Sequence, residues 1–202
     1  MSKQPGSNAR GEHVIYLHGL ESSPQGTKGQ FLFENYQALA VDLNTSAAIV
    51  SRDSADARDE PWSHATPDID QAFAVPLERA RAAITAETQV IVGSSFGGAV
   101  LTHLIAEGSW HGPCLFIASA GIKLVGHVDC PPSAPIIFLH GRHDTIIPID
   151  HSRQVAHASG PNVQLWEIGD DHFMRSITTN GTLRAAVDLL LEWSNGRTPA
   201  VD

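Results

Sequence analysis

Short apolar runs alternate along the chain with longer stretches in which apolar residues recur at helical spacing. The runs predict β-strands at 14–17, 89–92, 114–118, 135–140 and 163–168, with another strand starting at residue 40. The helical spacing predicts α-helices over 29–39, 70–85, 149–158 and 183–191, a further helix around 100–105, and an end to the last helix near Gly196. Strands that alternate with helices in this way favour a parallel sheet covered by helices on both faces.

Two connections lack such a pattern. Residues 44–67 carry many charged side chains and one tryptophan, Trp62. We expect a solvated surface loop that Trp62 holds against the core, and the alternative is a flap that gates a substrate. The connection from Ser119 to Pro135 is short, so a large lid is not expected there.

The chain length of 202 residues fits one domain with a sizeable core. We expect a flexible N-terminal segment at 1–12, a single domain at 13–196 and a C-terminal tail at 197–202.

Charge and composition narrow the classes of partner. The formal net charge of −9, with 13 Lys and Arg residues that form no run, argues against nucleic acid or an anionic membrane, because both need a cationic face. No signal peptide and no apolar segment of bilayer-spanning length stand out, so we expect a cytoplasmic protein. Cys114 and Cys130 fit a reducing compartment, and neither has the spacing of a metal site.

The five residues Gly93-Ser94-Ser95-Phe96-Gly97 follow an apolar strand and precede a helix. This strand, tight turn and helix form the setting of a nucleophile elbow, in which a serine projects its hydroxyl from the end of the sheet. The two glycines provide the room that such a turn needs, which makes Ser95 the candidate nucleophile. The alternative is a glycine-rich turn whose hydroxyls cap the following helix without any chemistry.

A candidate acid and a candidate base come later in the chain, each just past a predicted strand. Asp144 follows the strand at 135–140, and His172 follows the strand at 163–168. The carboxyl ends of parallel strands share one edge of a sheet, so we expect these side chains to meet Ser95 there. A neutral imidazole at His172 would take the hydroxyl proton of Ser95, and Asp144 would orient that imidazole.

Four pieces of sequence in this order resemble the α/β-hydrolase superfamily, in particular its small esterase-like members without a cap. They are His18-Gly19-Leu20, residues 93–98, residues 140–144 with Pro148, and Asp170-Asp171-His172. The resemblance extends from about His13 to Trp193. It implies an α/β fold with a mostly parallel sheet of about six strands, helices on both faces and no large cap domain. The two additional N-terminal strands of fuller relatives are not expected before His13.

The resemblance also implies an oxyanion hole formed by backbone groups. Its donors would be the N–H of Phe96, directly after the nucleophile, and the N–H of Leu20. The supporting residues would be Gly19, Gly93, Gly97 and His18, the last of which would brace the oxyanion loop.

Other assignments remain open at this stage. His143 is a second candidate base, and Asp170 and Asp171 are alternative acids. Imidazoles and carboxylates also gather on two loops, which raises a zinc or iron site as an alternative. The residues concerned are His140, His143, Asp144, Asp170, Asp171 and His172. The remaining histidines, including His64, His103, His111, His127, His151 and His157, are expected to be exposed.

These observations favour a serine hydrolase that cleaves carboxylic esters or thioesters of small to medium acyl groups through an acyl-enzyme. No cofactor and no metal are expected, and the partner is a small-molecule ester or thioester. An acyltransferase or a peptidase on the same residues is the first alternative. The second is a ligand-binding protein on a hydrolase scaffold, since a fold alone does not specify a function. The sequence carries no signal for an oligomeric state.

Overall fold

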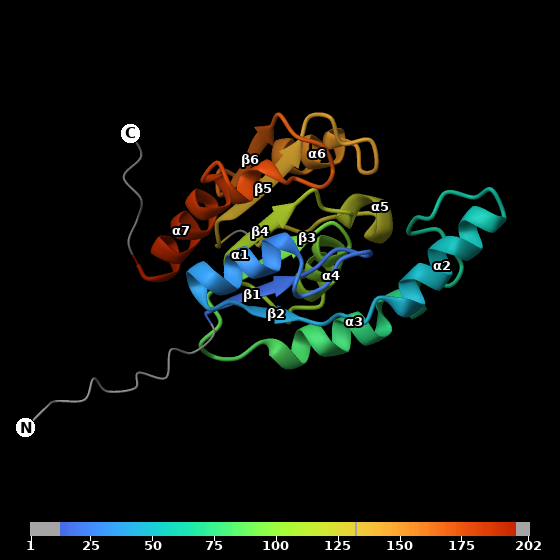
Figure 1. The fold of residues 1–202 in the computed structure, drawn as a ribbon, viewed down its shortest axis with the longest axis horizontal. Helices are drawn as coiled ribbons and strands as arrows, with labels where there is room; N and C mark the ends of the chain where they lie inside the picture. The colour runs from blue at the N-terminus through green and yellow to red at the C-terminus, as the bar shows by residue number, and fades with distance from the viewer. Residues whose placement is uncertain (1–12, 132, 197–202) are drawn as a thin grey trace, which may run out of the picture.

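A computed structural model describes residues 13–131 and 133–196 and contains one six-stranded sheet (Figure 1). Its order is β2-β1-β3-β4-β5-β6, and every neighbouring pair is parallel. The strands are β1 (Val14–Leu17), β2 (Leu39–Val41), β3 (Val90–Ser94), β4 (Cys114–Ile117), β5 (Ile136–Gly141) and β6 (Val163–Ile168). The expected α/β fold with about six parallel strands is confirmed. The segments 1–12 and 197–202 of the expected domain division lie outside the described residues.

Helices cover both faces of the sheet. They are α1 (Thr27–Tyr36), α2 (Ser46–Ala57), α3 (Ile69–Ala83), α4 (Phe96–Ala106), α5 (Gly121–Val125), α6 (Ile149–Ala158) and α7 (Thr182–Ser194), with a 3₁₀ turn η1 at Ser176–Thr178. Apolar side chains of α1 and α7 form the core on one face, and those of α3, α4 and α6 form the core on the other.

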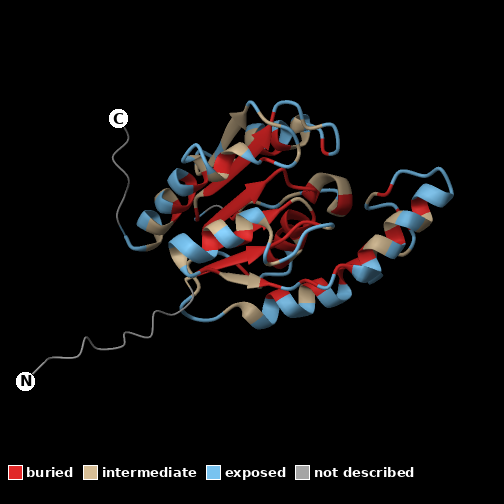
Figure 2. Ribbon diagram, in the orientation of Figure 1, coloured by how far each residue is buried: buried red, intermediate tan, exposed pale blue. Residues whose placement is uncertain are grey.

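Alternation along each strand divides its side chains between these two cores. In β1, Ile15 and Leu17 join the core under α3 and α4, whereas Val14 and Tyr16 join the core under α1 and α7. All four side chains are buried, which explains why no charged residue interrupts this strand. Figure 2 shows the same burial along the central strands. Continuous apolar runs are typical of parallel strands buried on both faces.

The strand order reverses between β1 and β3. The chain runs from β1 to β2 on one side and then returns to β3 on the other side of β1. The loops that leave β1 and β3 therefore turn away from each other, and in parallel sheets ligands bind at the carboxyl ends of the strands beside such a reversal.

The expectation of an irregular loop at 44–67 is wrong, because residues 46–57 form α2, which extends away from the body of the sheet (Figure 1). Its buried positions are Ala48, Ser51 and Ala55, at helical spacing. Alanine and serine are too weakly apolar to make that stripe stand out in the sequence. Trp62, which follows the helix, is buried as expected, and its ring stacks on Phe96 with centroids 6.3 Å apart.

Three smaller differences concern helix ends and histidines. The first predicted helix ends at Tyr36 instead of residue 39, because Gln37 adopts a left-handed conformation with φ of 55° and Leu39 begins β2. His103 and His151 are half-buried, contrary to expectation. His103 packs edge-on against Phe73, with ring centroids 4.5 Å apart.

Over the described ranges, the connection from 119 to 135 contains only the five-residue α5 and no large cap. Within the same ranges, none of the helices has the length and apolar character needed to cross a membrane. Both cysteine thiols are free.

The packing of α2 depends on Trp62, whose Nε1–H also donates to Ser51 Oγ at 3.1 Å. Replacing Trp62 by Ala is expected to lower the free energy of unfolding by about 3 kcal/mol, measured by urea denaturation, because a large buried ring is lost. Trp62→Phe keeps a stacking ring and should lose less. A Trp62→Ala protein as stable as the wild type would contradict this packing.

Candidate active site

Ser95 lies between the end of β3 and the start of α4, in a backbone conformation that is rare for any residue except glycine. Its φ is 53° and its ψ is −113°. Of residues 91–100, Ser95 alone is not buried. Such strain persists only where surrounding contacts enforce it. Here it turns the hydroxyl out of the sheet at the carboxyl end of β3.

Three glycines enforce this turn. A Cβ at Gly97 would lie 2.1 Å from the carbonyl oxygen of Leu17, and one at Gly93 would lie 2.7 Å from that of Gly97. At Gly98 it would meet the Ser119 hydroxyl at 2.5 Å. Close packing of the elbow against β1, against its own backbone and against Ser119 therefore requires glycine at these three positions. Gly98 joins the two glycines already expected.

The structure brings Ser95, His172 and Asp144 together in one hydrogen-bonded chain. His172 Nδ1 lies 2.8 Å from Asp144 Oδ2, and His172 Nε2 lies 3.0 Å from Ser95 Oγ. A carboxylate can only accept, so Nδ1 carries the ring proton and Nε2 is free to accept from the hydroxyl. The three side chains follow β3, β5 and β6, at the carboxyl edge where the sequence predicts them. Their catalytic roles stay predictions.

Asp144 is held by hydrogen bonds on both carboxylate oxygens. Oδ1 accepts from the backbone N–H of Ile146 at 2.9 Å and of Ile147 at 2.8 Å. Oδ2 faces His172 and also lies 3.2 Å from His140 Nε2. Burial alone would raise the pKa of Asp144, but the hydrogen bonds from His140, His172 and Ile147 hold it well below its usual range. The carboxylate is therefore charged at neutral pH.

The loops carrying Asp144 and His172 are joined through their backbones. Arg142 N–H donates to Ile168 O at 2.8 Å, and His143 N–H donates to Asp170 O at 3.1 Å. Lys28 Nζ of α1 donates to the backbone carbonyl oxygen of Phe173, the residue after His172, at 2.8 Å. This hydrogen bond connects the His172 loop to α1. Burial lowers the pKa of Lys28 to about 8. These contacts fix the position of the His172 ring relative to Asp144.

The two predicted oxyanion donors are the backbone N–H groups of Phe96 and Leu20, and both lie next to Ser95 or on the turn that packs against it; their role stays a prediction. Phe96 is the first residue of α4, so its N–H has no partner within the helix. Leu20 follows Gly19, and a Cβ at Gly19 would lie 3.5 Å from the Cβ of Ser95. Ser22 N–H donates to Gly19 O at 3.2 Å, which closes a turn with Leu20 at its first central position, where the N–H points outwards.

The imidazole ring of His18 holds this turn in place through hydrogen bonds. Its Nδ1–H donates to Gly19 O at 2.8 Å, and its Nε2 accepts from the N–H of Leu43 at 3.1 Å. Thr45 Oγ1 donates to Leu20 O at 2.8 Å, so the segment leading into α2 holds the same turn. The bracing role expected for His18 matches these contacts.

The alternative acids and base do not join the chain of hydrogen bonds. His143 is exposed. Asp170 accepts from the N–H of Ser176 at 2.8 Å, and Asp171 accepts from that of Phe173 at 2.9 Å, so both carboxylates shape their own loop. Among residues 13–131 and 133–196, no group of three or more His, Cys, Asp or Glu side chains is arranged to hold a metal ion.

Sequence reasoning did not identify Thr45, Lys28 or Ser152 as site residues, and it considered His140 only as a metal ligand. Lys28 donates to a backbone carbonyl 145 residues away in the sequence, and Thr45 donates to one that is 25 residues away. No local pattern marks such contacts. His140 stands four residues before Asp144, but its direction depends on Ser152 of α6, with Oγ 2.7 Å from Nδ1.

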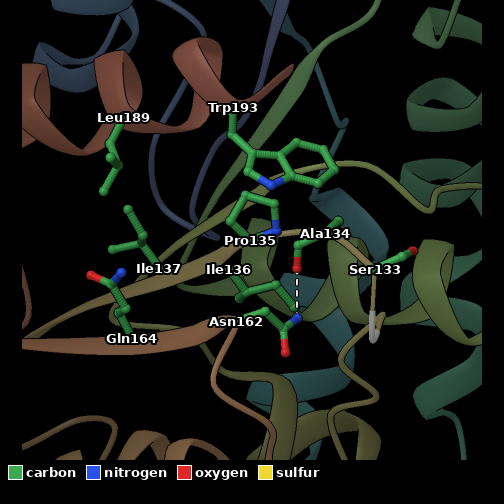
Figure 3. A pocket seen from close by; sticks show the side chains of 9 residues that line it. All are labelled: Ser133, Ala134, Pro135, Ile136, Ile137, Asn162, Gln164, Leu189 and Trp193. Atoms are coloured by element: carbon green, nitrogen blue, oxygen red, sulfur yellow. Dashed lines mark hydrogen bonds between the residues drawn. The ribbon is translucent and has the colours of Figure 1, made fainter. Parts of the chain in front are cut away.

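A cavity with a volume of about 210 Å³ lies elsewhere in the structure. Its lining includes Pro135 at the start of β5, Asn162 before β6 and Trp193 of α7 (Figure 3). It therefore opens at the amino ends of the strands, opposite the edge where Ser95 lies. The hydrogen-bonded side chains, and not this cavity, locate the candidate site.

Comparison with solved structures shows that the chain has the α/β-hydrolase fold. A candidate hydrolase of the α/β superfamily from Xanthomonas campestris pv. campestris is 24% identical, with a TM-score of 0.66 over 90% of this chain and 98% of that one. Est1E from Butyrivibrio proteoclasticus is 14% identical, with a TM-score of 0.58 over 89% and 86% of the two chains. The esterase Pf2001 from Pyrococcus furiosus is 16% identical, with a TM-score of 0.58 over 91% and 84%. No protein-family model matches the sequence, and no curated protein matches it.

The depressed pKa of Asp144 makes a prediction about stability. A charged, hydrogen-bonded carboxylate stabilises the fold above the ordinary carboxyl pKa of about 4, and this contribution is lost as the pH falls towards the lower folded value. Asp144→Asn should lower the free energy of unfolding by roughly 2 kcal/mol at about pH 7, and this difference from the wild type should shrink below about pH 4.

Chemical denaturation across this pH range measures both effects. Asp129→Asn, which changes an exposed carboxylate, is the matched control and should remain close to the wild type throughout. A penalty for Asp144→Asn that does not change with pH would show that the charge of this carboxylate contributes nothing.

Proposed function

We propose that this chain, which has the α/β-hydrolase fold, is a serine hydrolase of the carboxylesterase or thioesterase type. One observation carries the proposal. The Ser95 hydroxyl stands on a strained turn, 3.0 Å from a ring nitrogen of His172 whose other nitrogen is 2.8 Å from a buried carboxylate. A hydroxyl is a weak nucleophile until a neighbouring base removes its proton, and this arrangement provides that base.

The first half of the reaction forms an acyl-enzyme. Ser95 Oγ attacks the carbonyl carbon of the ester while its proton moves to His172 Nε2. Asp144 stabilises the resulting imidazolium, since Oδ2 already accepts from Nδ1–H. The tetrahedral intermediate then collapses, the bond to the leaving oxygen or sulfur breaks, and His172 gives its proton to the departing alcohol or thiol.

The second half reverses these steps with water as the nucleophile. Water loses a proton to His172 and attacks the acyl carbon, and the bond to Ser95 Oγ breaks as the proton returns to the serine. The carboxylic acid then leaves. In both halves, negative charge develops on the carbonyl oxygen, and the N–H groups of Phe96 and Leu20 would stabilise it. Such donors contribute about 3 to 4 kcal/mol each in the transition state.

Features around Ser95 support an ester with an apolar acyl or alcohol part. Ile146, two residues after Asp144, is 49% exposed, and Phe173, next to His172, is 54% exposed. The Phe173 ring stands edge-on to the His172 ring with centroids 6.2 Å apart. The described residues include no large cap, which favours small to medium acyl groups. One of the similar structures is that of Pf2001 from Pyrococcus furiosus, a protein named an esterase.

Replacing Ser95 by Ala tests the proposed nucleophile. We expect turnover of a short-chain p-nitrophenyl ester to fall by roughly a thousandfold or more, because the covalent route is lost. Labelling by a fluorophosphonate probe should disappear as well. Ser94→Ala, which changes the neighbouring buried serine of the same turn, is the control and should keep both activity and labelling. Full turnover by Ser95→Ala would rule out the proposed mechanism.

A panel of p-nitrophenyl esters and acyl-CoA thioesters of increasing chain length tests the substrate class. We expect kcat/KM to be highest for short and medium acyl groups and to fall for long ones, since residues 13–131 and 133–196 form no cap that could cover a deep acyl tunnel. A steady rise in kcat/KM up to the longest acyl chain would contradict this part of the proposal.

A further inference from the structure

Asp144 faces two imidazoles, and only one of them takes part in the chemistry described above. The second belongs to His140, near the end of β5, whose side chain is completely buried. Its Nε2 lies 3.2 Å from Asp144 Oδ2, the same oxygen that accepts from His172, and 3.0 Å from Ile147 O. Its Nδ1 lies 2.7 Å from Ser152 Oγ of α6.

These partners fix where the proton of His140 resides. Nε2 faces a carboxylate oxygen and a backbone carbonyl, which can only accept hydrogen bonds. A bare lone pair on Nε2 would therefore be repelled by both, so Nε2 must carry a hydrogen. Ser152 is a partner that suits Nδ1, because a hydroxyl can donate to a bare ring nitrogen. The buried ring is fully hydrogen-bonded, as buried polar groups must be.

We propose that His140 is a positioning residue that acts on the catalytic base through Asp144. Its Nε2–H donates to Ile147 O and also lies against Oδ2, which is 3.2 Å from Nε2. This contact holds Oδ2 towards His172 and shares the negative charge that His172 would otherwise receive alone. The imidazolium of His172 is then less stabilised than it would be beside an unshared carboxylate. The effect on catalysis rests on the proposed function, whereas the effect on the His172 ring does not.

Ile147 O alone could satisfy the Nε2–H of His140, so burial of the ring does not by itself explain the contact with Asp144. The additional approach to Oδ2 links the ring to the site. The loop of His172 also carries Asp170, Asp171 and Arg175, and all three interact with Lys28 of α1, which binds the same loop. From α6, His151 interacts with His140. A substitution of His140 leaves all of these groups in place.

Two substitutions separate positioning from simple packing. His140→Phe fills a similar volume and removes the donor to Oδ2. His140→Gln keeps an N–H near the position of Nε2. For His140→Phe, we expect the acid limb of the kcat/KM profile to move to higher pH by about half to one unit. We expect kcat to fall roughly tenfold with little change in KM, because the base is less well oriented. His140→Gln should remain near the wild type on both measures.

Nuclear magnetic resonance of the imidazole nitrogens tests the proposal without catalysis. In the unmodified full-length chain, His140 should carry a proton on Nε2. In His140→Phe, the midpoint pH of the His172 ring titration should rise by the same amount as the midpoint pH of the acid limb of the kcat/KM profile. If the chain turns out not to hydrolyse esters, this shift still reports whether His140 acts on His172 through Asp144.

Ser152→Ala removes the hydrogen bond to Nδ1 that orients the His140 ring, so it should lower the melting temperature and move the acid limb in the same direction as His140→Phe, by a smaller amount. His157→Phe, which changes an exposed histidine of α6, is the matched control and should leave the acid limb unchanged. A His140 that is protonated only on Nδ1 would overturn the proposal, and this result needs no variant that might fail to fold. An unshifted His172 titration in His140→Phe would also overturn the proposal. The same holds for a shift in His140→Gln that equals the shift in His140→Phe.

Discussion

The left-handed backbone of Ser95 is the constraint on which the rest of the site depends. A non-glycine residue held at φ of 53° is unfavourable and persists because the elbow is enclosed by close backbone contacts. The carbonyl of Leu17 in β1 leaves no room for a side chain at Gly97, and Gly93 is enclosed in the same way. The strain turns the hydroxyl outwards and places the first N–H of α4 beside it. One local conformation thus supplies both the candidate nucleophile and half of the candidate oxyanion hole.

The sheet brings the remaining parts to this point. Because all six strands are parallel, the segments after β1, β3, β5 and β6 leave from one edge. Backbone hydrogen bonds join the Asp144 loop to the His172 loop. Lys28 of α1 also donates to a backbone carbonyl of the His172 loop. His18 and Thr45 hold the turn that carries Leu20. The side chains that would react, and the turn beside them, are therefore held by neighbours from distant parts of the chain, which is the kind of preorganisation that catalysis requires.

The sequence predicts the parts that follow from periodicity and from the parallel sheet. Apolar runs located the strands, and the shared edge predicted that Ser95, Asp144 and His172 would meet. Contacts between distant residues left no such pattern. The tie from Lys28 to Phe173 spans 145 residues, and the direction of His140 depends on Ser152 of another element. α2 was missed because its buried face consists of Ala48, Ser51 and Ala55, whose side chains are too small to give a clear hydrophobic stripe.

The account centres on a covalent acyl group attached to Ser95 during turnover. The most direct test is to mix the protein with an excess of a short-chain activated ester, quench with acid within the first turnovers, and measure the intact mass and the digested peptides by mass spectrometry. The account predicts a mass increase of one acyl group, located on the peptide that contains Ser95. Hydrolysis of the ester without any acylated protein, or with the acyl group on another residue, would contradict it.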